Sequence, residues 1–144
     1  MKKAIVSLII VFLFGCGPEQ GEGTLYTYTI KNESGKNITI KAFRPNRPEI
    51  APIMTNLAIG EKLTKTYKDA LPPRSYDFKK FFGDSWTDSI IVIYEKSKFN
   101  GFEYGCFESD RNPLNACVYN RANETFIFTA QDYENAQACN GNCD

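Results

Sequence analysis

The sequence contains no histidine. This absence removes the commonest metal ligand of proteins and the usual general base of hydrolases. It excludes catalytic groups of the Ser-His-Asp and Cys-His kinds in their common forms. The cysteines beyond residue 16 also lack the paired Cys-x-x-Cys spacing that is typical of zinc sites. We therefore expect no metal ion and no other cofactor.

The chain has no excess of charge of either sign and no block of basic residues. Lysine and arginine together number 17, as do aspartate and glutamate. Removal of residues 1–15 would take away Lys2 and Lys3 and leave 15 basic against 17 acidic residues, a net charge of −2. Nucleic acid is therefore not an expected partner. Glycine-rich nucleotide loops and the Gly-x-Ser-x-Gly motif are also missing from the sequence.

Long apolar runs are absent, apart from one short run near the start. Residues 4–14 form a run that is apolar except for Ser7, follows the basic pair Lys2 and Lys3, and precedes Gly15. A membrane-spanning helix needs about 20 apolar residues, so this run is too short to cross a membrane. A basic start, an apolar run and a small residue in this order are typical of a secretory signal, which we assign to residues 1–15.

The end of the apolar run, Leu13-Phe14-Gly15-Cys16, resembles the lipobox of bacterial lipoproteins. In that family the cysteine carries acyl chains such as palmitate and becomes the new N-terminus. The resemblance implies lipidation at Cys16 and a location in the bacterial cell envelope, on a membrane leaflet that is left open. Residues 16–23 are rich in Gly, Pro, Gln and Glu, which cannot build a core, and we assign them to a flexible tether. A membrane, reached through the lipid, is thus an expected partner.

The remaining residues, 24–144, have the size of one ordinary domain. Short alternating or apolar segments, separated by turn signals, predict about seven or eight strands. We expect an all-β fold: a single, loosely immunoglobulin-like β-sandwich with one short C-terminal helix. A small up-and-down barrel is the alternative. The early strands contain no cysteine, so the disulfide that joins the sheets of antibody domains is not expected.

Local patterns give more specific predictions for the strands. Residues 25–31 and 37–43 alternate, and a turn over residues 34–36 would pair them as a hairpin with Ile30 opposite Ile40. Residues 90–94 are apolar on both faces, as in a buried strand. Further strands are expected near residue 53 and over residues 63–67, 76–80, 117–119 and 125–128.

Two other patterns predict a turn and a helix. Asn100-Gly101 is typical of a two-residue hairpin turn, which would place Cys106 opposite Glu95. The segment from Thr129 to Asp132 has the pattern of a capping box and predicts a helix over residues 130–137.

Four cysteines remain beyond the lipid site: Cys106, Cys117, Cys139 and Cys143. An even number of cysteines in an exported chain predicts disulfides, with zinc as the weaker alternative. Four cysteines can pair in three ways, and the sequence does not choose between them. Local pairing would close two short loops, whereas crossed pairing would tie the C-terminal tail to the body of the domain.

Residues 81–88 hold the one tryptophan of the chain beside aromatic rings and carboxylates. An exposed ring next to carboxylates can stack on a sugar and bind its hydroxyl groups. The candidate ligand-binding residues are Phe82, Asp84, Trp86 and Asp88. The favoured alternative is that Trp86 and Phe82 cap the open end of the core. The acidic side chains could also hold calcium through their oxygen atoms, although the ligand order of an EF-hand is missing.

Several segments together resemble small uncharacterised β-rich lipoproteins of Bacteroidota-type bacteria. They are the lipobox and residues 32–35, 88–92 and 126–133. The resemblance implies a structure and a location but no activity.

We expect a non-enzymatic binding or accessory module of the envelope, with an envelope protein or a glycan as partner. No residue is assigned a catalytic role. One alternative is an inhibitor of a lytic enzyme, because the chain is similar in size, anchoring and disulfide content to envelope lipoproteins that block lysozyme. Another is a carboxylate hydrolase. Its acids would come from Glu95, Glu103, Glu108 and Asp110.

Overall fold

The computed structural model describes residues 23–45, 47–69, 75–141 and 143. The predicted signal peptide, the predicted lipid site at Cys16 and most of the predicted tether lie outside the described residues. Within the described ranges, no helix is both long enough and apolar enough to cross a membrane.

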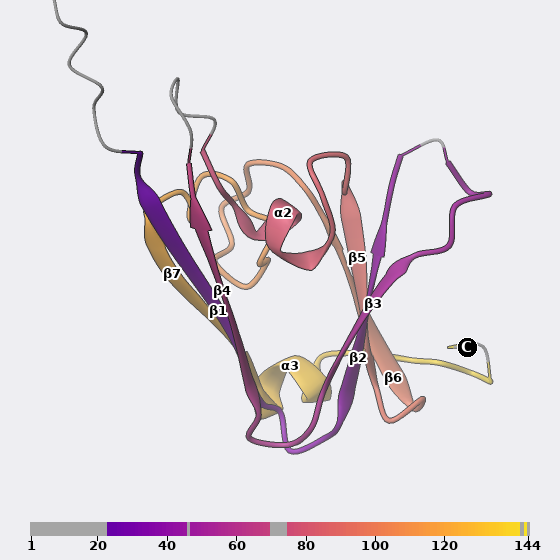
Figure 1. Cartoon of the computed structure of the whole chain (residues 1–144). Coiled ribbons are helices and arrows are strands. Elements are labelled where there is room, and N and C mark those ends of the chain that lie inside the picture. The colour runs from indigo at the N-terminus through magenta and orange to yellow at the C-terminus, as the bar shows by residue number, and fades with distance from the viewer. Residues whose placement is uncertain (1–22, 46, 70–74, 142, 144) are drawn as a thin grey trace, which may run out of the picture.

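The domain is a sandwich of two β-sheets, which confirms the predicted fold class (Figure 1). One sheet has three strands in the order β4-β1-β7, and the other has five in the order β3-β2-β5-β6-β8. The strands are β1 (Leu25–Glu33), β2 (Ile38–Phe43), β3 (Ile53–Leu57), β4 (Lys62–Lys68), β5 (Ser89–Tyr94), β6 (Lys98–Glu103), β7 (Asn123–Thr129) and β8 (Gln137–Ala138). The described helices are α2 (Phe78–Phe82) and α3 (Ala130–Glu134).

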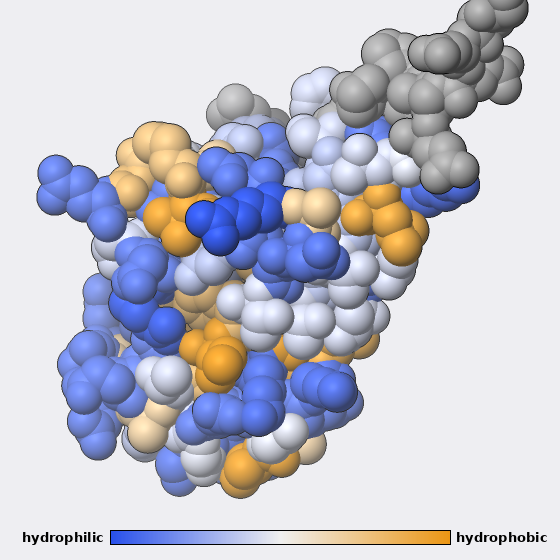
Figure 2. Space-filling model, turned by 90° about the vertical axis from the view of Figure 1, so that its left-hand side faces the viewer, coloured by the Kyte–Doolittle hydropathy of each residue, from blue (hydrophilic) through white to orange (hydrophobic). Residues whose placement is uncertain are grey.

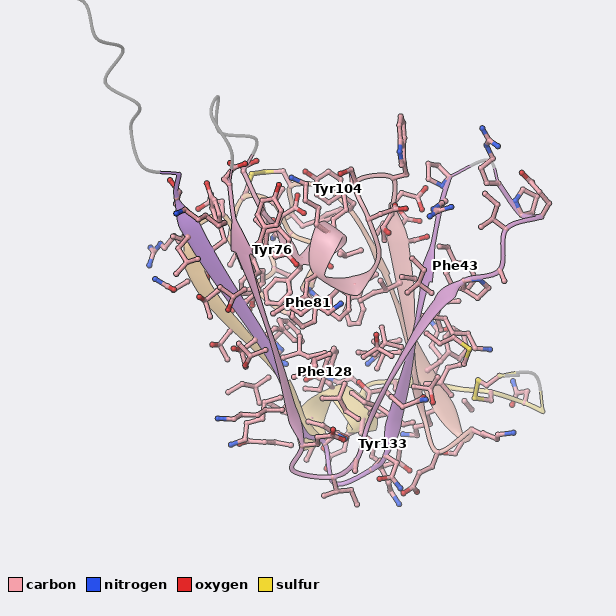
Figure 3. All side chains as sticks on the ribbon, in the orientation of Figure 1. Phe43, Tyr76, Phe81, Tyr104, Phe128 and Tyr133 are labelled. Atoms are coloured by element: carbon pink, nitrogen blue, oxygen red, sulfur yellow. A yellow bond between two sulfur atoms is a disulfide. The ribbon has the colours of Figure 1, made fainter. Side chains whose placement is uncertain are left out.

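Aromatic and branched side chains fill the space between the sheets. Tyr28 and Ile30 of β1 and Ile90 and Val92 of β5 are fully buried in one core cluster, as their alternation predicts. Figure 3 shows Tyr76, Phe81 and Phe128 in the same space. Burial of each such side chain stabilises the fold by about 1.5–3 kcal/mol.

The first two strands do not form the predicted hairpin. Ile30 pairs with Leu63 of β4, whereas Ile40 pairs with Val92 of β5, so β1 and β2 belong to different sheets. The predicted apolar faces are correct, because both residues are buried. The two faces meet across the core instead of lying side by side in one sheet.

The fully buried side chain of Asn32 gives the physical reason. Its Nδ2 donates to the carbonyl oxygens of Lys36, Leu57 and Ala58, and its Oδ1 accepts from the backbone N–H and the hydroxyl of Ser34. These bonds satisfy backbone groups in two connections that cross between the sheets, the one from β1 to β2 and the one from β3 to β4. The turn after β1 is therefore an arch between sheets and not a hairpin turn.

The predicted turn at Asn100-Gly101 is also wrong. Both residues lie inside β6 and pair with residues of β5. Tyr94 pairs with Lys98, so the loop consists of residues 95–97. Its first two residues, Glu95 and Lys96, have positive φ angles of 46° and 58°. Asn100 instead donates to the hydroxyl oxygen of Tyr94 at 3.1 Å.

The true turn position also moves Cys106 away from Glu95. Cys106 lies beyond the end of β6 and forms a disulfide with Cys117. The second disulfide joins Cys139 to Cys143. Of the three connectivities that the sequence left open, the structure thus selects the local one.

The short helices confirm one local prediction and correct another. Residues 76–80 do not form a strand, because Asp77 caps a helix by accepting from the backbone N–H of Lys80 at 3.0 Å. The capping box of Thr129 and Asp132 is present, although α3 ends at Glu134 rather than at residue 137. The predicted strand over residues 117–119 consists of turns.

The outer face of the three-stranded sheet is largely hydrophilic, with only scattered hydrophobic residues (Figure 2). On β4, Lys62, Thr64 and Thr66 are exposed, whereas Leu63 and Lys65 between them are partly buried. This face offers no continuous apolar surface for a ligand, so the candidate site lies elsewhere.

Candidate functional site

A short turn over residues 83–88 joins α2 to β5 and carries the tryptophan. The carboxylate of Asp84 accepts from the backbone N–H of Trp86 at 2.9 Å, and the N–H of Asp84 donates to Oγ1 of Thr87 at 3.0 Å. Thr87 is buried. A Cβ atom on Gly83 would lie 2.1 Å from Oγ1 of Thr87, so only glycine fits there. The turn is thus held by its own hydrogen bonds and by this close approach.

Asp84 also forms an ion pair with Arg44, the first residue after β2. Burial alone would raise the pKa of Asp84. The N–H of Trp86 and the guanidinium of Arg44 outweigh this effect and hold that pKa below its ordinary value, because both stabilise the charged form. The pair therefore ties the tryptophan turn to the loop between β2 and β3.

The expectation that Trp86 caps the core is wrong, because 72% of its surface is exposed. Phe82 does take a core position, with 1% exposure. Its ring centroid lies 5.3 Å from that of Phe81 and 5.8 Å from that of Phe78. Since these rings already fill the end of the core, the indole ring stays in solvent.

Trp86 lines an open cavity of about 450 Å³ together with residues of the loop between β2 and β3. The other lining residues are Arg44, Pro45, Arg47 and Ile50. We call this space the Trp86 cavity. It joins one aromatic ring to two guanidinium groups, and no carboxylate is found among its lining residues in the described part of the chain.

Arg47 keeps more hydrogen-bonding capacity for a ligand than Arg44, which is paired with Asp84. Arg47 lies 3.7 Å from Glu49, but both side chains are largely exposed, so this ion pair contributes little and leaves the guanidinium accessible. The Nε–H of Arg44 is buried and has no hydrogen-bond partner among the described residues. Because this atom is buried, a ligand in the cavity would contact the rest of the Arg44 guanidinium and not this N–H.

The structure places only one of the four predicted ligand-binding residues at the cavity. Trp86 lines it, and Asp84 supports the turn that carries Trp86. Phe82 lies in the core. Asp88 accepts a hydrogen bond from the hydroxyl of Ser89 at 2.9 Å and is not part of the lining.

The sequence analysis missed Arg44, Arg47 and their loop as partners of Trp86. A signal was present, because residues 44–60 form a proline-rich connection of the kind that often carries function. Arg44 and Asp84 are 40 residues apart in the chain. They meet because β2 and β5 are neighbours in the sheet, a pairing that sequence patterns alone do not reveal.

Glu95 and Glu103, two of the acidic residues considered for hydrolysis, lie far apart. Glu95 follows the last residue of β5 and pairs with Lys36 at 3.1 Å, whereas Glu103 lies opposite Ser89 at the start of β5. The length of the strand separates the two glutamates by roughly 20 Å, about twice the largest spacing that glycosidases use. Across the described ranges, no group of three or more His, Cys, Asp or Glu side chains could hold a metal ion.

Comparison of the chain with protein-family models, with curated proteins and with solved structures found no match. A function must therefore be inferred from the geometry of the Trp86 cavity and from the N-terminal motif.

Proposed function

We propose that this chain is a lipid-anchored protein of the bacterial cell envelope that binds a ligand at the Trp86 cavity and catalyses no reaction. The observation that carries the proposal is the exposed indole of Trp86, fixed beside Arg44 and Arg47. Burial of apolar surface is favourable by about 25 cal/mol per Å², and a ring that stays in water lacks this stabilisation. Exposed tryptophan and arginine side chains are the residue types that contribute most at binding surfaces.

The turn around Trp86 supports a binding role, because it fixes the backbone that carries the ring before any ligand arrives. Asp84 bonds to the backbone of Trp86 and pairs with Arg44, so this backbone and one guanidinium are held by the same carboxylate. A preformed site loses less conformational entropy when it binds. The sequence motif Leu13-Phe14-Gly15-Cys16 supports the anchor and the envelope location.

The open aromatic cavity favours a binding module over the two alternatives. An envelope inhibitor would insert a rigid protruding loop into its target, whereas the exposed ring of Trp86 borders an open cavity. A carboxylate hydrolase would need two facing acids, and the separation of Glu95 and Glu103 gives that reading no support.

Capture of envelope components by the full chain tests the proposal. The tagged protein in detergent micelles is incubated with the solubilised envelope of the producing cells, in parallel with the Trp86→Ala and Phe107→Ala variants. Phe107 is a matched control, because it is an exposed aromatic residue outside the cavity. We expect the parent and Phe107→Ala to retain the same component and Trp86→Ala to lose it. Equal retention by all three proteins, or retention by none, would overturn the proposed site.

A further inference from the structure

A second open cavity adjoins the Trp86 cavity. It measures about 620 Å³ and is lined in part by Arg44 and Arg47, the same two residues that line the first. Its lining also includes Phe43, which Figure 3 places on the side of the five-stranded sheet away from the core. The two cavities therefore form one groove, which starts at Trp86, passes the two arginines and continues over the outer face of this sheet. We call it the ligand groove.

The floor of the second cavity is open because of a glycine. Gly101 of β6 lies opposite Ile91 of β5, and both residues line the cavity. A Cβ atom on Gly101 would meet no atom within 4 Å. Glu103 and Ser89 lie at the next outward-facing pair of the same strands and provide oxygen atoms at the edge of this floor. A flat ring could rest on the floor and bind to these oxygen atoms.

The two ends of the ligand groove differ in charge. The Trp86 cavity presents the exposed guanidinium of Arg47 beside Arg44, which is paired with Asp84. The guanidinium of Arg47 can bind a carboxylate through two parallel hydrogen bonds. The second cavity ends at Glu103, which repels an anion but accepts hydrogen bonds from hydroxyl groups. An anionic unit is thus favoured at Trp86 and an uncharged, hydroxyl-bearing unit over Gly101.

We infer that the ligand groove binds an acidic oligosaccharide in which a carboxylate-bearing sugar ring alternates with an uncharged one. This inference rests on the proposed binding function of the Trp86 cavity. The apolar face of the acidic sugar stacks on the indole ring while its carboxylate pairs with the exposed guanidinium of Arg47. The neighbouring uncharged sugar lies over Gly101, with its hydroxyl groups donating to Glu103.

Fluorescence of the one tryptophan allows a direct test on the full chain in micelles. The probes are glucuronate, the disaccharide and tetrasaccharide of hyaluronan, and chitotetraose as an uncharged chain of similar length. We expect the hyaluronan tetrasaccharide to bind at least about tenfold more tightly than glucuronate and than chitotetraose. Equal affinity for the acidic and the uncharged tetrasaccharide would overturn the assignment of the carboxylate to Arg47.

Two variants separate the two halves of the groove. Arg47→Gln should abolish the preference for hyaluronan over chitotetraose, because the side chain keeps its length but loses its charge. Gly101→Tyr should fill the second cavity and remove the gain from the longer chain. Thr64→Tyr is the matched control, because it places the same side chain on an exposed strand position of the other sheet. A parent-like affinity of Gly101→Tyr for the tetrasaccharide would show that the second cavity is not used.

The ligand class and the binding function can fail separately. If no acidic saccharide changes the fluorescence while Trp86-dependent capture from the envelope persists, the ligand class is wrong and the binding function stands. If both the saccharide response and the Trp86-dependent capture are absent, the binding function itself is wrong.

Discussion

The carboxylate of Asp84 accepts a hydrogen bond from the backbone N–H of Trp86 at 2.9 Å. This contact closes the turn that carries the indole ring, and the ring of this turn lies in solvent. The same carboxylate pairs with Arg44, so the aromatic and the cationic parts of the cavity share one anchor.

Asp84 should therefore make the stability of the domain depend on pH. Its pKa in the folded chain lies below the ordinary value, mainly because the Trp86 N–H and Arg44 outweigh the effect of burial. A lowered folded pKa contributes stability above the unfolded pKa of about 4, and this contribution is lost as the pH falls through the folded pKa. Melting temperatures of the parent, measured at chosen pH values from pH 6 down to pH 2, should show this loss of stability. Asp84→Asn should show a smaller decrease, and identical pH profiles would contradict the assignment.

Replacement of Trp86 by alanine should leave stability almost unchanged. The ring is 72% exposed, so we expect a change in the free energy of unfolding within about 0.5 kcal/mol. Phe82→Ala, which truncates a core ring, should cost about 3–5 kcal/mol and serves as the contrast. The fluorescence maximum of the parent should be that of a water-exposed indole. A large loss of stability in Trp86→Ala would mean that the ring is part of the core.

Gly83→Ala should distort the turn. The new Cβ atom would lie 2.1 Å from Oγ1 of Thr87, which is buried and cannot move freely. We expect the free energy of unfolding to fall by about 1–3 kcal/mol, measured by chemical denaturation. Gly101→Ala is the control: its Cβ has open space, so it should be neutral or slightly stabilising. Equal effects of the two variants would argue against the close contact at Gly83.

The exported protein should contain no free thiol among its four domain cysteines. Both disulfides are local, Cys106 with Cys117 and Cys139 with Cys143. Reduction should raise the intact mass by four hydrogens, and proteolysis without reduction should give peptides linked in these two pairs. Peptides linked across the two pairs would contradict the local connectivity.

Cys16→Ser should release the protein from the membrane without unfolding it. The lipid is the one anchor that the sequence predicts, and the domain core lies well beyond it. Cell fractionation should move the variant from the membrane pellet to the soluble fraction, with an unchanged melting temperature. A variant that still sediments with membranes and needs detergent for extraction would refute the lipobox assignment.

Sequence patterns predicted the fold class and most strands, because a strand that is buried on one face has apolar residues at every second position. Tyr28 and Ile30 alternate with exposed or partly buried neighbours, and Ile90 and Val92 form the centre of a strand, as predicted. The capping box at Thr129 could also be predicted from the sequence, since its partner Asp132 is only three residues away.

Strand pairing was not predictable in the same way, because its determinants lie far apart in the chain. Asn32 turns β1 away from β2 through carbonyl groups of Leu57 and Ala58, which no local pattern links to it. The hairpin turn at Glu95 and Lys96 carries none of the residues that favour positive φ.

The candidate site could be predicted only in part. Trp86 was identified as the residue most suited to binding, but its exposure depends on Phe82 filling the core in its place. Arg44 and Arg47 reach the cavity through the pairing of β2 with β5, so their role required the structure.

The start of β1 and the tryptophan turn lie at the same end of the sandwich (Figure 1). The predicted tether, residues 16–23, measures at most about 28 Å when fully extended. A lipid on Cys16 would therefore hold the mouth of the ligand groove within the thin layer of solvent next to the bilayer. In that position the protein would sample only polymers that lie close along the membrane surface, and the length of the tether would set how far from the membrane it can reach.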